Sequence, residues 1–239
     1  MQNSFRDSGF LGNLTPVVKN LLIINVMMFG ATFILEQKGT DLNGMLGLYY
    51  FDSPRFAVYQ IITHLFMHGS FLHLAFNMFA LVMFGSLIED RWGSKKFLLY
   101  YLLTGLGSAA LYTLSNAVEL QMLTGSISND LNTLRVTAEN APAVGAIYYS
   151  PCIGASGAVF GILAAFAFLF PDAPLGIMFI PVPIKAKYLV LGYAIIELVL
   201  GFTRLPGDNI AHFAHIGGAI TGFLLLLYWK SRGKLWARW

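Results

Sequence analysis

Charged residues are scarce in this chain of 239 residues: Asp, Glu, Lys and Arg together make up only 11% of it. Soluble domains of ordinary composition carry about 25% charged residues. Hydrophobic residues account for 56% of the chain, so too few polar side chains remain to coat a water-soluble globule of this size. The composition therefore excludes disorder and an ordinary cytosolic enzyme, and it indicates a membrane protein.

The chain also lacks the features of a disulfide scaffold, a zinc site or a nucleic-acid-binding protein. Cys152 is its only cysteine, which excludes a disulfide framework. His64 and His68 lie four residues apart, but no HExxH pattern accompanies them. We therefore predict no metal and no cofactor. The formal net charge of +3 is too small to indicate a nucleic-acid partner.

Six continuous apolar runs are long enough, together with their flanks, to cross a bilayer as helices. Strands of a membrane barrel would alternate apolar and polar residues, and these runs do not. The sequence therefore predicts an all-α membrane protein with six transmembrane helices in a single domain, residues 1–239. The domain divides into an N-terminal segment at 1–16, a core at 17–229 and a basic C-terminal tail at 230–239. The six runs are 17–35, 72–88, 97–114, 153–170, 188–202 and 213–229.

Basic residues divide unequally between the two sides of this six-helix arrangement. Of the 15 Lys and Arg residues, only Lys38, Arg55, Arg135 and Arg204 fall on the side opposite the termini, which leaves eleven on the side of the termini. Because cytoplasmic loops carry an excess of Lys and Arg, we expect both termini to be cytoplasmic. The expected location is a cell membrane, inner or plasma, which the chain crosses several times, with the lipid bilayer as a partner.

A serine flanked by small residues begins the fourth apolar run, in the sequence Gly154-Ala155-Ser156-Gly157. The N–H groups of a first helical turn have no partner within the helix and carry the positive end of the helix dipole. If Ser156 attacked a carbonyl, these groups could stabilise the resulting oxyanion, and the glycines would let a substrate backbone approach closely. A serine that only packs helices is the alternative interpretation.

A base for this serine is available in the sixth run. A serine hydroxyl is a weak nucleophile unless a base accepts its proton, and His215 lies near the start of that run. Small residues recur every four positions on both helices, a spacing that allows close helix packing in lipid. Packing them would bring Ser156 and His215 to one seam, although the glycines could equally serve packing alone. The small residues are Gly157, Gly161 and Ala165 on one helix and Ala214, Gly218 and Gly222 on the other.

Further polar residues inside or beside the runs have two interpretations each. His73 and Asn77 share a helix face and could donate hydrogen bonds to an oxyanion, or they could bond a loop carbonyl. Glu197, inside the fifth run, is either a proton relay or a structural group. Cys152 is either a reactive thiol or a small buried spacer. A cluster at Glu89, Arg91 and Gly93 is expected to tie loops together.

These motifs, taken together over about 63–229, resemble the rhomboid intramembrane serine proteases. The resemblance implies that Ser156 is the nucleophile and His215 the general base, without an Asp. It also implies an oxyanion hole of His73, Asn77 and the Ser156 amide. Gly154 and Ala155 would adjoin the oxyanion and the substrate, and His212 and Gly157 would have supporting roles. The matching motifs are HLFMH at 64–68, His73 with Asn77, EDRWG at 89–93, GASG at 154–157 and AHIGG at 214–218 followed by Gly222.

The function that this resemblance implies is cleavage of transmembrane protein substrates near the outer face of the bilayer through a Ser–His dyad. In one respect the chain departs from the family, which often has Trp-Arg where this sequence has Tyr59-Gln60. Two alternatives remain open. One is a catalytically silent rhomboid-like protein that binds transmembrane clients, and the other is a proton-coupled transporter that uses Glu197.

Overall fold

Helices make up most of the structure, a computed structural model that describes residues 14–128, 135–177, 180–203 and 210–238. Most of the N-terminal segment, Arg204 and the last residue of the basic tail lie outside the described residues. Among the described residues, five helical segments are long and apolar enough to cross a membrane, so the chain is a multi-pass membrane protein. They are α1 (Pro16–Glu36), the segment Phe71–Trp92, α6 (Ser94–Thr124), α9 (Ala186–Thr203) and α10 (His212–Ser231).

The fourth predicted run is a shorter helix, α8 (Ser156–Leu169), which has 14 residues. It begins at Ser156 rather than at the predicted residue 153. At about 1.5 Å per residue, α8 is about 21 Å long, which is less than the hydrocarbon core of about 30 Å. The five long segments and α8 correspond to the six predicted runs.

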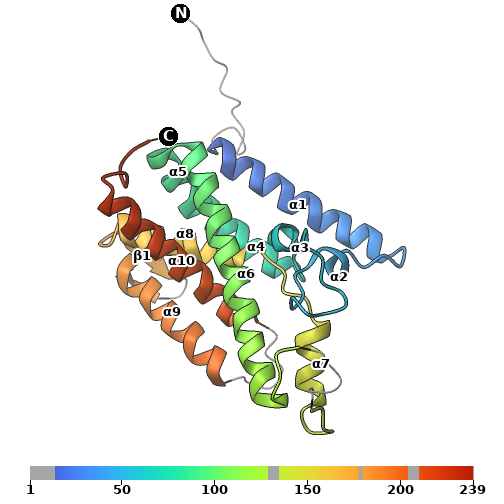
Figure 1. Cartoon of the computed structure of the whole chain (residues 1–239). Coiled ribbons are helices and arrows are strands. Elements are labelled where there is room, and N and C mark those ends of the chain that lie inside the picture. The colour runs from blue at the N-terminus through green and yellow to red at the C-terminus, as the bar shows by residue number, and fades with distance from the viewer. Residues whose placement is uncertain (1–13, 129–134, 178–179, 204–209, 239) are drawn as a thin grey trace, which may run out of the picture.

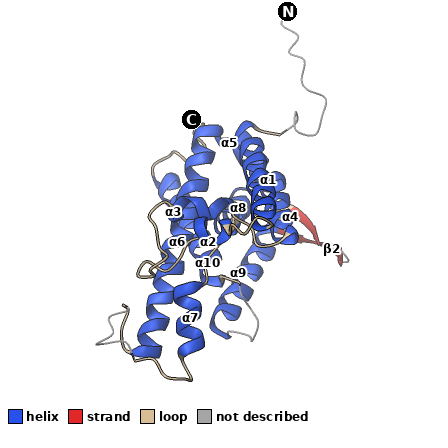
Figure 2. Ribbon diagram, turned by 90° about the vertical axis from the view of Figure 1, so that its right-hand side faces the viewer, coloured by secondary structure: helices blue, strands red, loops and turns tan. Residues whose placement is uncertain are grey.

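Two further segments differ from the prediction. The third run, predicted at 97–114, corresponds to a helix that continues to Thr124. The helix therefore extends beyond the apolar residues into a stretch of lower hydropathy. Between α8 and α9 the structure has a two-stranded antiparallel hairpin, which corrects the all-α prediction. Its strands β1 (Pro174–Ile177) and β2 (Ile180–Lys185) pair with Pro174 opposite Lys185, and the hairpin projects from the side of the helical bundle in Figure 2.

The segment Phe71–Trp92 consists of three consecutive pieces. Helix α4 (Phe71–Ala80) passes into a π-helical turn, η3 (Leu81–Gly85), and then into α5 (Ser86–Trp92). The Ser70 hydroxyl caps the start of α4 by accepting a hydrogen bond from the His73 N–H at 3.1 Å. Gly93, with φ of 85°, ends α5 and leads directly into α6.

Short helices lie in two of the connections between the longer helices. The chain between α1 and α4 contains α2 (Leu42–Leu46), α3 (Gln60–Thr63) and the 3₁₀ turn η2 (His64–Phe66). Helix α7 (Ala141–Tyr149) precedes α8 and lies beside the far end of α6 in Figure 1.

Close packing of small residues places α8 against α10 and α6. A Cβ atom added to Gly218 would overlap the backbone of Gly157, and one added to Gly222 would lie 3.1 Å from Gly161 Cα. On the opposite side, the space beside Gly161 is filled by the side chain of Thr104 from α6. The predicted packing of the two glycine series is therefore confirmed, and it leaves α8 almost entirely surrounded by protein.

The start of α1 and the C-terminal tail lie at the same end of the bundle, beside α5 (Figure 1). The Glu89 carboxylate accepts hydrogen bonds from the backbone N–H groups of Val17 and Val18 and from the Ser94 hydroxyl. It thereby caps the N-terminus of α1, which confirms the predicted structural role for Glu89. Lys96 donates to backbone carbonyls of the tail, at Lys234, Leu235 and Ala237.

Candidate active site

The segment that leads into Ser156 is attached to the first long loop by backbone hydrogen bonds. Leu48 and Cys152 exchange a pair of bonds, at 2.9 and 2.8 Å. Two residues later, the Gly154 N–H donates to the His64 carbonyl at 2.9 Å. The approach is so close that a Cβ on Gly47 would lie 2.7 Å from Ile153. The loop therefore fixes the position of the backbone just before the serine.

Gln60 holds this loop in shape. Its side chain is buried, and its amide nitrogen donates to the carbonyls of Met45 at 3.2 Å and Arg55 at 3.0 Å. Its amide oxygen accepts from the Ala57 N–H at 3.1 Å. Gln60 is one of the two positions where the sequence departs from the family pattern. Its structural role was missed because its partners lie in an irregular loop that no periodicity describes.

Gly154 brings His73 and Ser156 together. Its φ of 130° lies in a region that side-chain-bearing residues rarely adopt. A Cβ at this position would lie 2.7 Å from His73 Nε2 and 3.4 Å from Ser156 Oγ. The imidazole of His73, from the first turn of α4, therefore lies directly against the turn that presents the serine.

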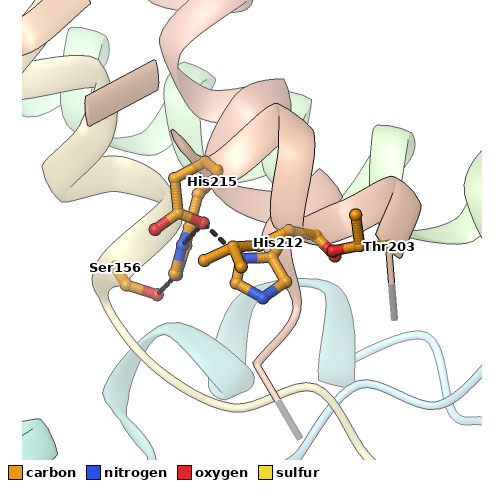
Figure 3. A network of polar contacts seen from close by, with 6 residues as sticks. Ser156, Thr203, His212 and His215 are labelled. Carbon is orange, nitrogen blue, oxygen red and sulfur yellow. Dashed lines mark hydrogen bonds and ion pairs between the residues drawn. The ribbon is translucent and has the colours of Figure 1, made fainter. Parts of the chain in front are cut away.

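Ser156 is the first residue of α8, and its hydroxyl is hydrogen-bonded to His215 from the first turn of α10. The distance between Ser156 Oγ and His215 Nε2 is 2.8 Å, and Figure 3 shows the two side chains directed at each other. Phe160, one helical turn after Ser156, stacks on the His215 ring with centroids 4.4 Å apart and planes inclined by 7°. The contact holds the imidazole in the plane that faces the serine.

A carboxylate completes the arrangement on the other side of His215. Glu197 Oε2 lies 2.8 Å from His215 Nδ1 and 2.7 Å from His212 Nδ1, and Figure 3 shows these histidines with their hydrogen bonds dashed. The resemblance implied a Ser–His dyad without an acidic third member. Glu197 precedes them by 18 and 15 residues, on another helix, so the contact arises from the packing of α9 against α10.

The remaining predicted site residues take varied positions. Asn77 donates its amide to the His73 carbonyl at 2.8 Å, within its own helix. Ala155 is fully buried immediately before α8, and Gly157 packs against Ser108 and the backbone of α10. Their roles toward an oxyanion or a substrate stay predictions.

Within the described part of the chain, Glu197, His212 and His215 form a group that could hold a metal ion, because their ligand atoms lie within 4.8 Å of one another. The same nitrogen and oxygen atoms already form hydrogen bonds with one another. The arrangement can therefore equally be a hydrogen-bonded network of these three side chains, without a metal ion. His64 and His68, the pair considered from the sequence, are not part of this group.

Burial favours the neutral forms of His64, His68 and Cys152, which lie beside the turn that leads to Ser156. It lowers the pKa of His64 to about 4 and, with a contribution from His73, that of His68 to about 3. Burial also raises the pKa of the Cys152 thiol to about 12. A thiol that stays protonated is a poor nucleophile, which favours the interpretation of Cys152 as a spacer.

Comparison with known proteins identifies relatives over most of the chain. A family model described as "Rhomboid domain" matches residues 55–232. The mitochondrial RHOMBOID-like protein 12 of Arabidopsis thaliana is 30% identical over 209 residues, covering 85% of this chain and 55% of that protein. The mitochondrial presenilin-associated rhomboid-like protein of Homo sapiens is 27% identical over 229 residues, covering 93% and 52%.

A third relative carries a protease name. Rhomboid-like protease 3 of Toxoplasma gondii is 24% identical over 196 residues, covering 82% of this chain and 61% of that protein. The chain spans about half the length of the first two of these curated relatives.

Proposed function

Because this chain belongs to the rhomboid family, we propose that it is an intramembrane serine endopeptidase that cleaves transmembrane substrates near the outer face of the bilayer. The observation that carries the proposal is the hydrogen bond of 2.8 Å between Ser156 Oγ and His215 Nε2 at the N-terminus of α8. A serine, a base and an unpaired helix terminus in contact are the groups that acyl transfer requires.

The proposed reaction proceeds in two steps. Ser156 Oγ attacks the scissile carbonyl carbon while His215 Nε2 takes the hydroxyl proton, and that proton then passes to the leaving amine. Water next attacks the acyl-enzyme, with His215 again accepting a proton, and releases the second product. Each proton that His215 takes it also returns, so no other reactant is needed.

The oxyanion would form against the first turn of α8. The amide of Ser156 belongs to the N–H groups without a helical partner. The His73 ring lies against Gly154, two residues before Ser156. Asn77 has a second amide hydrogen besides the one it donates to the His73 carbonyl. These donors would stabilise negative charge on the attacked oxygen.

The short length of α8 supports a catalytic site inside the membrane. In the proposed topology six helices cross the bilayer with both termini cytoplasmic, and the shorter helix begins below the outer surface. Its polar residues then require a water-filled cavity rather than lipid. A helical substrate hides its carbonyls in its own hydrogen bonds, so we expect cleavage of segments with small or helix-breaking residues near the outer interface.

The proposed location is the inner or plasma membrane of the cell. The mitochondrial names belong to the relatives and are not transferred to this chain. Separation of cell membranes by density, with detection of the chain in each fraction, tests the location. Recovery in an organelle membrane alone would refute it.

The test of the proposed activity uses the purified full chain in detergent with a single-span model substrate. The unaltered protein is expected to cleave it, while Ser156→Ala and His215→Ala lose cleavage by at least about 10³-fold. A fluorophosphonate should label Ser156 in the unaltered protein only. Thermal unfolding of each variant checks that it is folded.

Each alternative function predicts a different outcome of this test. A catalytically silent binder neither cleaves nor is labelled, and it keeps its clients after Ser156→Ala. A transporter shows uptake that depends on Glu197 and ignores Ser156. If all three forms cleave equally, the activity belongs to a contaminating protease, and the proposal fails.

A further inference from the structure

One oxygen of Glu197 accepts hydrogen bonds from two histidines at once. Glu197 lies on α9, and both His212 and His215 lie in the first turn of α10, with Nδ1–Oε2 distances of 2.7 and 2.8 Å. Only 5% of the Glu197 side chain and 12% of the His215 side chain are exposed. A buried carboxyl group is costly unless it is hydrogen-bonded, and here one of its two partners is the proposed base, His215.

The shared oxygen determines where the His215 proton is. A carboxylate oxygen only accepts hydrogen bonds, so an imidazole nitrogen that contacts it must carry a hydrogen. Placing that hydrogen on Nδ1 of His215 leaves Nε2 with a lone pair, directed at Ser156 Oγ 2.8 Å away. This is the tautomer in which a histidine can accept the proton of a serine. The opposite tautomer would place two lone pairs against each other.

We propose that Glu197 is a positioning residue that makes this site a Ser156–His215–Glu197 triad rather than a dyad. The carboxylate holds His215 in the proton-accepting tautomer, and it stabilises the imidazolium that forms when Ser156 gives up its proton. His212 holds the carboxylate in place through its own bond to Oε2. The inference rests on the proposed function and deepens it.

The His215 ring is surrounded by groups from α4, α8, α9 and α10. Glu197 contacts its Nδ1 from α9 and Ser156 its Nε2 from α8. His212 lies one turn earlier on α10, with ring centroids 6.4 Å apart, and His73 interacts with the ring electrostatically from α4. Phe160 covers one face, itself in contact with Tyr193. Glu197 is the carboxylate among these groups, so removing it changes the charge that His215 experiences.

The experiment measures kcat, KM and the pH dependence of kcat for Glu197→Gln in the cleavage assay. We expect kcat to fall by about 10²–10⁴-fold with little change in KM, because the residue acts through His215 and not on the substrate. We also expect the acidic limb of the kcat profile to move to lower pH, because the variant removes the negative charge that lies beside the proposed base. A role limited to joining α9 and α10 would lower stability without moving that limb.

Two variants complete the comparison. Glu197→Asp keeps a carboxylate and is expected to recover part of kcat together with the pH profile of the unaltered enzyme. Glu36→Gln makes the same chemical change at the exposed end of α1 and is expected to change nothing. The rate of fluorophosphonate labelling of Ser156 follows the same order, without depending on the substrate.

A second measurement keeps the test valid if Glu197→Gln does not fold. In the unaltered protein, ¹H–¹⁵N NMR of the histidine rings, with His215→Ala for assignment, is expected to find the His215 hydrogen on Nδ1 and none on Nε2 at neutral pH. A hydrogen on Nε2 overturns the inference, as does a Glu197→Gln variant with unchanged kcat and unchanged pH profile. In both cases cleavage by the unaltered protein leaves the proposed function standing. An unaltered protein that neither cleaves nor is labelled overturns both.

Discussion

Gly154 has a backbone conformation and a neighbour that both require glycine. We expect Gly154→Ala to introduce strain of about 1–2 kcal/mol, because its φ of 130° is unfavourable for a residue with a Cβ. The new methyl group would also lie 2.7 Å from His73 Nε2 and push away a proposed oxyanion donor. Loss of one such donor costs about 10²–10³ in kcat. The measurements are kcat in the cleavage assay and the unfolding temperature.

Gly145→Ala is the matched control for this substitution. Gly145 lies inside α7, and nothing approaches within 4 Å of where its Cβ would be. Alanine there should leave kcat unchanged and stabilise the protein by about 0.5–1 kcal/mol. If Gly154→Ala behaved in the same way, the contact between this turn and His73 would have no part in the reaction.

At the scale of single residues, the sequence predicts groups joined by a regular spacing. Ser156 at a helix entry and the small residues that bring it to His215 follow from four-residue periodicity. Glu197 does not, because 18 residues separate it from His215 and the two lie on different helices. A solitary acid in an apolar run indicates a buried partner, but no one-dimensional pattern identifies which one.

The 3₁₀ turn η2, which begins at His64, joins the first long loop to the active-site segment, and its stability should depend on pH. Burial lowers the pKa of His64 from 6.5 to about 4 in the folded protein, so between these values the unfolded chain binds a proton that the folded chain does not. Stability from this residue is therefore complete above pH 6.5 and is lost as the pH falls, by about 3 kcal/mol at pH 4. The unfolding temperature in detergent, measured from pH 7 to pH 4, should decrease accordingly.

The variant His64→Gln isolates this contribution. Glutamine does not titrate, so the unfolding temperature of the variant should depend less steeply on pH, while His68 keeps its own share of the slope. Because the His64 carbonyl accepts from Gly154, loosening of the turn should lower activity over the same pH range. Identical slopes for the variant and the unaltered protein would show that the charging of His64 does not destabilise the fold.

At the scale of elements, hydropathy predicts which segments are helices and less well where they end. Helix α6 continues to Thr124, beyond its apolar stretch, because helical hydrogen bonds do not require an apolar sequence. Helix α8 begins at Ser156 because Gly154 interrupts the apolar run just before it. The β1–β2 hairpin was missed, since strand pairing depends on two short segments meeting.

Considered as a whole, the molecule keeps its two described ends on one side, and this arrangement permits a test of orientation. Lys38 follows α1 and Lys234 follows α10, and both side chains are exposed. With cytoplasmic termini, a cysteine at Lys38→Cys should react with a membrane-impermeant maleimide in intact cells. One at Lys234→Cys should react only after the membrane is permeabilised. Cys152 contributes little background, because burial raises the pKa of its thiol to about 12 and maleimide reacts with the thiolate.

Both labelling variants leave the interior intact, so their outcomes report orientation and not folding. The Lys234 side chain is not used in the contact with Lys96, which involves the carbonyl of residue 234. Repeating the labelling with Cys152→Ser added to each variant shows how much of the signal comes from Cys152. The reverse pattern would place the termini outside, so that Ser156, which the chain reaches from the opposite side, would open toward the cytoplasm. Cleavage at the outer face would then be impossible, whatever the chemistry of Ser156 and His215, because the substrate would enter from the other leaflet.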